Sequence, residues 1–461
     1  MIFTECTEIL LLFYFKTSIK ISRVQLTFRA LRVKCTGKKI CFPEAYCPGG
    51  DKMTTENDTE RPSLKSILKQ PGNDICADCG APDPQWGSCT LGVLLCHGCS
   101  GIHMTIMEIS KIKPLVDSKW ADSEVQFLAA HGNKVAKLKY ETAVPIYYHR
   151  PKYLDAQILK EQWIKAKYER QEFMDPMKRQ TYQEELREGY LMKRGRDNGQ
   201  YLSRRFVLTE KEGTLKYYTK EDNKVPKVAI KVDVINATFQ PEKIGHSNGL
   251  QISFLKDNRT RNLFLFHEDG RVMVDWFNAI RAVQFRWLKL AFPAAPDQEL
   301  TTRMMRMYVK EGFMEKTGPR QTEVFKKRWF TLDNRRLMYF KDPLDAFAKG
   351  ELFLGQKDLG YSASPGLPEG RECGEWSHGI TVTTPERSYV FTCESEGDQQ
   401  DWLRHFNKVI NSVMSPQDFA SKQPSLPAPQ NKTHMYICRQ CPLPHPPSFC
   451  SGILAQTQMK R

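Results

Sequence analysis

Two pairs of cysteines impose the strongest constraint on how this chain can fold. Cys76 and Cys79 form one Cys-x2-Cys pair, and Cys96 and Cys99 form a second pair after a gap of sixteen residues. Four thiolates at this spacing are typical of a closed tetrahedral zinc site, which holds a small domain together and performs no chemistry itself. We therefore expect one structural Zn²⁺ ion bound by these four cysteines.

The residues around the cysteines predict a finger covered by helices. Residues 91–95 alternate like a strand that leads to the second pair, and Trp86 is expected to pack beside the metal. Apolar residues at helical spacing over 123–130 are followed by Gly132-Asn133, where we expect the helix to end, and a second amphipathic helix is expected over 162–173. These helices are long enough to cover a finger that is too small to bury its own core.

A sequence repeat occupies the second half of the chain. The stretch Arg187-Glu-Gly-Tyr-Leu-Met-Lys193 returns as Lys310-Glu-Gly-Phe-Met-Glu-Lys316, and each copy closes with a helical stretch that carries a tryptophan, Trp276 or Trp402. Copies this far apart indicate two domains, because the repeats of a solenoid span only ~20–50 residues. Short alternating strands followed by one amphipathic helix predict, in each copy, a small antiparallel barrel or sandwich capped by a C-terminal helix.

The predicted fold class is therefore multidomain α+β. The expected divisions are a cysteine domain with covering helices at 63–185, a first repeat at 186–289, a linker at 290–308 and a second repeat at 309–413. Residues 1–62 are expected to be a disordered or non-native leader, and the Pro- and Ser-rich residues 414–461 a disordered tail. Weaker alternatives are small metal sites built on Cys35, Cys41 and Cys47 or on Cys438 and Cys441.

The overall charge indicates a polyanionic partner. The formal net charge is +15 and the sequence pI is about 9.1, which favours nucleic acid or an anionic membrane surface. No apolar run approaches the ~18–20 residues of a membrane helix, and no secretion signal is evident. Four of the fourteen cysteines have metal-ligand spacing, so we expect a reducing compartment, the cytoplasm, with membranes reached from inside.

The basic residues gather at the start of each repeat. Residues 187–206 carry six Lys and Arg against two acids, and residues 309–330 carry six against three. A hairpin that brings them together would form a cup for a multiply phosphorylated headgroup, with Arg as a bidentate and Lys as a point-charge donor. The candidate residues are Lys193, Arg205, Tyr217 and Lys227 in the first repeat and Lys316, Arg328, Tyr339 and Lys349 in the second.

Two alternatives to a headgroup cup remain. A basic strand face without a dedicated ligand is one of them. Nucleic acid is the weaker one, because it favours exposed aromatic side chains for base stacking, whereas the aromatic residues here fall at expected core positions of the strands. Two cups on one chain would also strengthen membrane binding, because linking two sites raises affinity by ~10²–10⁴.

Several motifs resemble known families. Cys76-x2-Cys79-Gly-Ala-Pro-Asp-Pro, Trp86 and Cys96-x2-Cys99-x-Gly101-Ile102-His103 resemble the zinc finger of the Arf GTPase-activating proteins. The two repeats resemble pleckstrin homology (PH) domains, and the order resembles the ArfGAP proteins with dual PH domains, the centaurin-alpha group. Stretches such as Lys193-Arg-Gly-Arg-Asp-Asn-Gly199 and Tyr339-Phe-Lys-Asp-Pro-Leu-Asp-Ala-Phe347 make the match close, and it covers roughly residues 70–415.

The resemblance implies partners and a location. It implies an Arf-family small GTPase as partner, and PH domains that bind the 3,4,5-trisphosphate lipid and soluble inositol phosphates. It also implies a cytoplasmic protein that is recruited to the plasma membrane. By this resemblance, the headgroup-binding positions are Lys193, Arg205, Lys316, Lys326 and Arg328.

The sequence departs from this family at one decisive position. The family places a catalytic arginine directly after the histidine of the finger, and Met104 follows His103 here. An arginine finger contributes ~10³–10⁵ in rate through its charged, planar donors, and a thioether has neither charge nor donor. We therefore assign no catalytic residue. Two hypotheses follow: a phosphoinositide-recruited GTPase activator for Arf, and a catalytically impaired membrane adaptor.

Overall fold

The computed structural model describes residues 63–419 except for 117, 220–223, 257–258, 305–307, 319–322 and 415–417. The expected leader, nearly all of the expected tail and both weaker cysteine clusters lie outside the described residues. Within the described ranges, no helix is long and apolar enough to cross a membrane.

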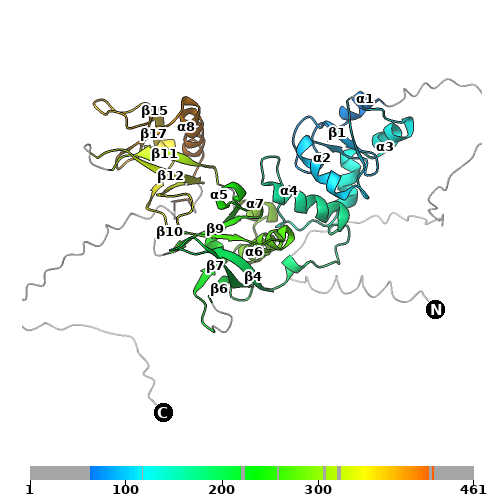
Figure 1. Ribbon diagram of the computed structural model, residues 1–461, viewed down its shortest axis with the longest axis horizontal. Helices are drawn as coiled ribbons and strands as arrows, with labels where there is room; N and C mark the ends of the chain where they lie inside the picture. The colour runs from blue at the N-terminus through cyan, green and yellow to red at the C-terminus, as the bar shows by residue number, and fades with distance from the viewer. Residues whose placement is uncertain are drawn as a thin grey trace, which may run out of the picture. The chain divides into compact units, whose positions relative to one another are not determined.

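The first part of the described chain, residues 63–183, is called here the cysteine module. Its small sheet has the strand order β2-β1-β3, and helices surround it (Figure 1). Its elements are α1 (Leu64–Leu68), β1 (Trp86–Ser88), β2 (Leu94–Leu95), α2 (His97–His103), the 3-10 turn η1 (Met104–Ile106), β3 (Ile112–Pro114), α3 (Asp122–Tyr140), α4 (Gln157–Ile164), the π-helical turn η2 (Lys165–Glu169) and the 3-10 turn η3 (Thr181–Gln183).

Helix α3 is interrupted where the sequence predicts a helix end. Gly132 has a non-helical backbone, with φ 65° and ψ 173°, and a second helical segment follows it to Tyr140. Glycine adopts a positive φ without the strain that a side chain would add, so the predicted end at Gly132 is confirmed, whereas the second segment was not predicted. The side chain of the next residue, Asn133, accepts from Leu94 N–H and donates to the carbonyls of Gly72 and Ile75. These bonds fasten α3 to the loops that carry the cysteines.

The first β-domain, residues 186–291, is a seven-stranded antiparallel sheet followed by a helix. Its strand order is β7-β6-β5-β4-β10-β9-β8. The elements are β4 (Leu186–Arg194), β5 (Tyr201–Thr209), β6 (Thr214–Tyr218), β7 (Val228–Lys231), the 3-10 turn η4 (Val232–Val234), β8 (Asn236–Phe239), α5 (Pro241–Ile244), β9 (Leu250–Lys256), β10 (Arg259–Phe266) and α6 (Gly270–Ala291).

The second β-domain, residues 310–410, repeats this topology and follows the linker helix α7 (Asp297–Thr302). Its strand order is β14-β13-β12-β11-β17-β16-β15, and α8 lies beside its strands (Figure 1). The elements are β11 (Lys310–Lys316), β12 (Lys326–Asp333), β13 (Arg336–Phe340), β14 (Gly350–Phe353), the 3-10 turn η5 (Lys357–Leu359), β15 (Ser362–Pro365), β16 (His378–Thr383), β17 (Ser388–Cys393) and α8 (Glu396–Ile410). The predicted pair of helix-capped antiparallel domains is confirmed.

Both β-domains close in the same way. The first strand meets the last strand at only two register positions in each domain, β4 with β10 and β11 with β17. The tryptophan of the closing helix packs on a glycine of the first strand. A Cβ at Gly189 would lie 3.5 Å from the ring of Trp276, and a Cβ at Gly312 would lie 3.6 Å from the ring of Trp402.

The hydrophobic cores divide the chain differently from the repeat. The cysteine module and the first β-domain share one continuous core, which includes Trp163 and Trp276. The second β-domain has its own main core around Trp402. The two β-domains still contact each other, as the short linker predicts, and a partly buried ion pair joins Lys243 Nζ to Glu311 Oε1 at 2.7 Å.

Candidate functional site

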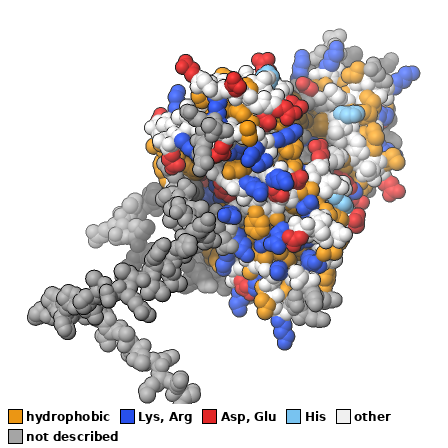
Figure 2. Space-filling model, turned by 60° about the vertical axis from the view of Figure 1, so that its left-hand side comes forward, with side chains coloured by type: hydrophobic (Ala, Val, Ile, Leu, Met, Phe, Trp, Pro, Cys, Tyr) orange, Lys and Arg blue, Asp and Glu red, His pale blue; other side chains and the backbone are white. Residues whose placement is uncertain are grey.

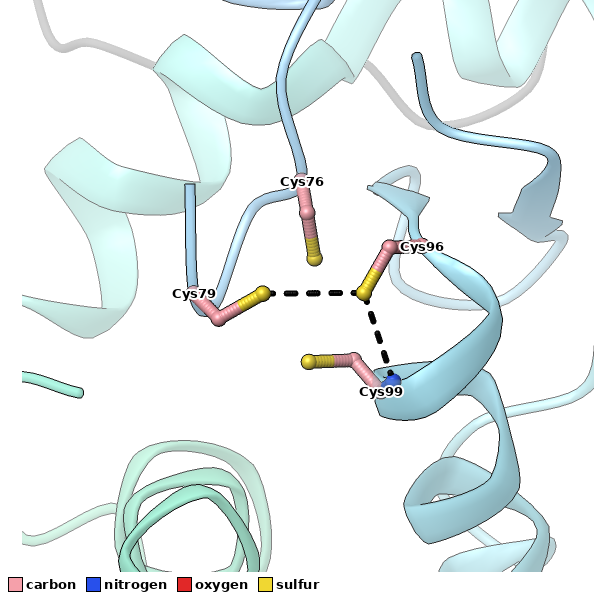
Figure 3. Close-up of side chains that lie close together, drawn as sticks. All are labelled: Cys76, Cys79, Cys96 and Cys99. Carbon is pink, nitrogen blue, oxygen red and sulfur yellow. Dashed lines mark hydrogen bonds between the residues drawn. The ribbon is translucent and has the colours of Figure 1, made fainter. Parts of the chain in front are cut away.

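Four cysteine sulfurs converge in the cysteine module. Cys76 and Cys79 lie in the loop before β1, Cys96 caps the N-terminus of α2, and Cys99 lies in the first turn of that helix. All four thiols are free, their sulfurs lie within 4.8 Å of one another, and they point toward a common centre (Figure 3). Zn–S bonds of about 2.3 Å in a tetrahedron place the sulfurs about 3.8 Å apart. The Cys79–Cys96 distance of 3.5 Å is close to that value, so this donor set fits a zinc ion.

A buried polar network surrounds the cysteine cluster. The carboxylate of Asp78 accepts from His103 Nε2 at 2.9 Å, from Lys167 Nζ at 3.0 Å and from the Tyr168 hydroxyl at 3.0 Å. Burial alone raises the pKa of Asp78, but Lys167 and His103 outweigh it and bring that pKa to about 2. Lys167 also pairs with Glu141 at 2.9 Å. The network links η2 and the end of α3 to the loop that carries Cys76 and Cys79. The spacing of residues in the sequence did not predict this network.

Met104 occupies a fixed and accessible position. It is the C-cap residue of α2, the helix that begins at Cys96, and 46% of its surface is exposed. The preceding residue, His103, is fully buried, and its Nδ1 lies 2.7 Å from Ser110 Oγ. The backbone at Met104 is therefore positioned by the cysteine cluster on one side and by the Asp78 network on the other.

The first cup lies where β4, β6 and β10 of the first β-domain approach each other. Lys193 is on the same face of β4 as the buried Leu191, and its Nζ lies 5.3 Å from the centroid of the Tyr217 ring. The Tyr217 hydroxyl accepts from Arg261 Nη2 at 3.3 Å. The structure thus brings two predicted residues, Lys193 and Tyr217, together with an arginine that we did not predict.

The second cup has the same design. Lys316 Nζ lies 4.8 Å from the centroid of the Tyr339 ring, and both residues line a cavity of about 80 Å³ that also includes Arg387. The guanidinium carbon of Arg387 lies 4.2 Å from the centroid of Tyr389. Lys326 is directly opposite Lys316 in the sheet register, so it lies on the cup face.

In the first β-domain, the arginine on the cup face of the second strand differs from the one that the sequence analysis predicts. Arg328 is opposite the buried Met314 and therefore on the cup face. In the first domain the residue opposite the buried Leu191 is Arg204. Arg205 lies on the other face of β5, where it pairs with Glu188 at 3.0 Å and stacks 4.3 Å from the Tyr218 ring. Successive strand residues point to opposite faces, so Arg204 lies on the cup face and the predicted Arg205 lies on the face away from the cup.

Because successive strand residues face opposite sides, Lys227 and Lys349 point away from the cups. Both are exposed, and their backbone N–H groups donate to Tyr217 O and Tyr339 O at 2.9 and 2.8 Å. The residue after each lysine, not the lysine itself, is the register partner of the cup tyrosine. These two lysines lie at the outer rim of the sheet edge.

Arg261 and Arg387 also lie at the cups, and the sequence analysis did not predict them. Each stands four residues before the residue that pairs with the cup lysine, Leu265 for Lys193 and Phe391 for Lys316. This equal offset in the two repeats could have identified them. Arg261 lies in β10, the last strand of its domain, and Arg387 directly precedes β17, the last strand of the second domain, so both are far along the chain from the basic hairpin.

The cups concentrate positive charge. Burial, followed by the charges of Arg261 and Arg204, lowers the pKa of Lys193 to about 8. Burial and then Arg387 and Arg328 lower the pKa of Lys316. Lys and Arg side chains also gather near the middle of the face shown in Figure 2. An anion placed among these cations would relieve their mutual repulsion, and Arg with Lys suits phosphate oxygens.

Comparison with known proteins gives consistent matches along the described chain. The ArfGap family model, a GTPase activating protein for Arf, matches residues 61–177, and the PH domain model matches 185–285 and 308–411. The chain is 53% identical over 347 residues to "Arf-GAP with dual PH domain-containing protein 2" of Rattus norvegicus, covering 75% of this chain and 92% of that protein. The chain is 50% identical over 365 residues to the Homo sapiens protein of that name, covering 78% of this chain and 96% of that protein. "ADP-ribosylation factor GTPase-activating protein AGD12" of Arabidopsis thaliana is 37% identical over 120 residues, 26% of this chain and 36% of that protein.

Proposed function

Because this chain belongs to the family of Arf-GAP proteins with dual PH domains, we propose that it is a GTPase-activating protein for Arf-family small GTPases that phosphoinositides recruit to the membrane. The observation that carries this proposal is the matched pair of cationic cups. Lys193, Tyr217 and Arg261 in one β-domain recur as Lys316, Tyr339 and Arg387 in the other.

The ligand of the cups is a phosphoinositide headgroup, with the 3,4,5-trisphosphate lipid as the best match. The first cup joins one lysine and two arginines and the second joins two lysines and two arginines, and several phosphates are needed to satisfy these cations. The headgroup residues are Lys193, Arg204 and Arg261 in the first cup and Lys316, Lys326, Arg328 and Arg387 in the second. The tyrosines Tyr217 and Tyr339 pack under the lysines, and the exposed Lys227 and Lys349 attract the anionic membrane from the rim.

One zinc ion holds the cysteine module together. Cys76, Cys79, Cys96 and Cys99 supply four thiolates, which leave no open coordination position for a substrate. The metal therefore supports structure, and it fixes α2 so that the surface around Met104 is presented in one orientation. This surface is the one that we assign to contact with Arf.

The activation step depends on groups besides an arginine. A GTPase activator also stabilises the arrangement in which the GTPase orients its attacking water. The exposed, fixed end of α2 can supply such a contact, but Met104 supplies no charge to the transition state. We therefore expect activation below the ~10³–10⁵-fold that an arginine finger adds.

A second candidate function rests on the same residue. If the cysteine module binds its partner without accelerating hydrolysis, the protein is a membrane adaptor held by its two PH domains. Met104 is the specific observation that favours this alternative. In either case, we place the protein in the cytoplasm and, after trisphosphate lipid is formed, at the plasma membrane.

Single-turnover hydrolysis of GTP by Arf on vesicles with trisphosphate lipid separates the two functions. The unaltered chain should accelerate hydrolysis, and Met104→Arg should accelerate it further by at least about 10-fold, because it restores a charged fork. Met104→Gln, which adds polarity without charge, is the matched control and should resemble the unaltered chain. Acceleration by Met104→Arg alone would establish the adaptor and overturn the activator.

A further inference from the structure

The first cup is contacted by a loop of the second β-domain. This segment, residues 342–348 between β13 and β14, is called here the docking loop. Its Phe347 forms an isolated antiparallel bridge with Arg261 of β10. Two backbone hydrogen bonds flank the bridge, from Asn262 N–H to Ala346 O at 2.8 Å and from Ala348 N–H to Thr260 O at 3.0 Å. The loop thus adds a short strand to the edge of the first β-domain.

The edge that the docking loop occupies is the one that leads into the cup. Strand β10 pairs with β9 along its length and with β4 only at Leu265 and Phe266. Upstream of those residues its second edge is released from β4, and the loop takes that edge. In the second β-domain, β17 likewise pairs with β11 at only two positions. The space beside its unpaired edge is the cavity that Lys316, Arg387 and Tyr389 line.

Side chains of the first cup also participate in this contact. The guanidinium carbon of Arg261 lies 5.4 Å from the Phe347 ring and 5.7 Å from the Phe254 ring, so the loop helps to enclose this cup arginine. Arg194, next to the cup lysine, donates to Leu344 O at 3.2 Å. A headgroup that engages Arg261 through its phosphates must therefore compete with the loop for the same cation.

The docking loop is anchored in the second cup. Tyr339 precedes it, and Gly350 and Glu351 follow it, and all three line the second cavity. Glu351 also reaches across the domains, where its Oε1 accepts from Thr260 N–H at 2.8 Å and from Thr260 Oγ1 at 2.5 Å. One carboxylate therefore lines the second cup and binds the strand that carries Arg261.

We propose that the docking loop masks the first cup, so that an inositol polyphosphate headgroup, free or on a lipid, enters this cup only when the loop leaves β10. The inference rests on the proposed headgroup function and adds that the two cups differ: the second is open and the first is gated. The residues that flank the loop line the second cup. Occupation of the first cup therefore releases the hydrogen bonds between the loop and β10, which hold the two β-domains together at this edge.

The test uses the full chain with the second cup disabled by Lys316→Ala and Arg328→Ala. Titration calorimetry with inositol 1,3,4,5-tetrakisphosphate should show one site, and adding Phe347→Ala should tighten it by about 5- to 30-fold, the range expected for loss of one cation–π contact. Phe347→Tyr retains the ring and should leave the affinity unchanged. Sedimentation with vesicles that carry the trisphosphate lipid should show the same gain, which tests the lipid as a second source of the headgroup.

Hydrogen exchange gives an independent readout of loop release. The amides of Asn262 and Ala348 are bonded across the domains, so the headgroup should speed their exchange in the disabled-cup variant. Binding with unchanged exchange at these amides, and with no effect of Phe347→Ala, would overturn the masking and leave the proposed function intact. Failure of the unaltered chain to bind the headgroup at either cup would overturn the proposed function itself.

Discussion

The choice between two adjacent arginines gives the sharpest prediction about the first cup. Arg204 is opposite Leu191 on the cup face of β5, whereas Arg205 is opposite Tyr190 and pairs with Glu188. Replacing Arg204 by alanine removes a charged donor to the headgroup phosphates, which is worth ~1.5–3 kcal/mol. The dissociation constant of the first cup should therefore rise about 10- to 150-fold.

The matched variant is Arg205→Ala. It removes the same charge from the same strand but breaks only a surface ion pair with Glu188 and a contact with Tyr218, and such pairs contribute ~0–1 kcal/mol to stability. Its headgroup affinity should change by less than about 3-fold, because long-range charge alone is screened by salt. Both variants are measured by calorimetry in the chain whose second cup carries Lys316→Ala and Arg328→Ala. A larger loss for Arg205→Ala than for Arg204→Ala would refute the register argument.

Two further predictions concern pH and the metal. The pKa of Lys193 is lowered to about 8, so this lysine loses its charge as the pH rises through that value. The headgroup affinity of the first cup should therefore fall by up to about 10-fold between pH 7 and pH 9. Lys193→Arg should abolish this pH dependence, and an unchanged pH profile in that variant would contradict the assignment of Lys193 to the cup. Removing the metal with a chelator should destabilise the cysteine module and the first β-domain together, because they share one core. The unfolding transition of the second β-domain should stay in place, because its main core is separate. Scanning calorimetry in which all unfolding transitions moved equally, or none moved, would count against a structural zinc.

The cysteine spacing and the repeat were strong predictors because both depend on local rules. Metal ligands at Cys-x2-Cys spacing must converge, and Figure 3 shows that they do. The repeat predicted two copies of one domain, and the two sheets have the same strand order. Alternating strands and a final amphipathic helix were sufficient to predict the fold class.

The composition of the cups was harder to predict because it depends on register and distant strands. A shift of one residue reverses the face of a strand, which is why Arg205 was chosen in place of Arg204. Aligning Arg204-Arg205-Phe206 with Arg328-Trp329-Phe330 would have identified the correct residue, since both phenylalanines are buried. Arg261 reaches its cup from the last strand of its domain and Arg387 from the residue before the last strand, and only a comparison of the two repeats could have marked them.

Tertiary contacts account for what the sequence could not predict at all. Lys167 looks like a solvated residue of an amphipathic helix, yet it is almost fully buried against Asp78 and Glu141. Gly132 ends the first helical segment of α3, as predicted, but the second segment that follows it to Tyr140 was not predicted. The docking loop joins residues from separate domains, so neither repeat alone contains the information that would place it.

We propose that phosphoinositide binding by the two cups brings an active Arf regulator to the membrane. The most direct measurement compares single-turnover GTP hydrolysis by membrane-bound Arf on vesicles with and without phosphatidylinositol 3,4,5-trisphosphate, using the unaltered chain. We predict that the chain accelerates hydrolysis on the trisphosphate vesicles and that the acceleration is lost when the lipid is omitted. Equal rates on both kinds of vesicle, or no acceleration on either, would contradict the account.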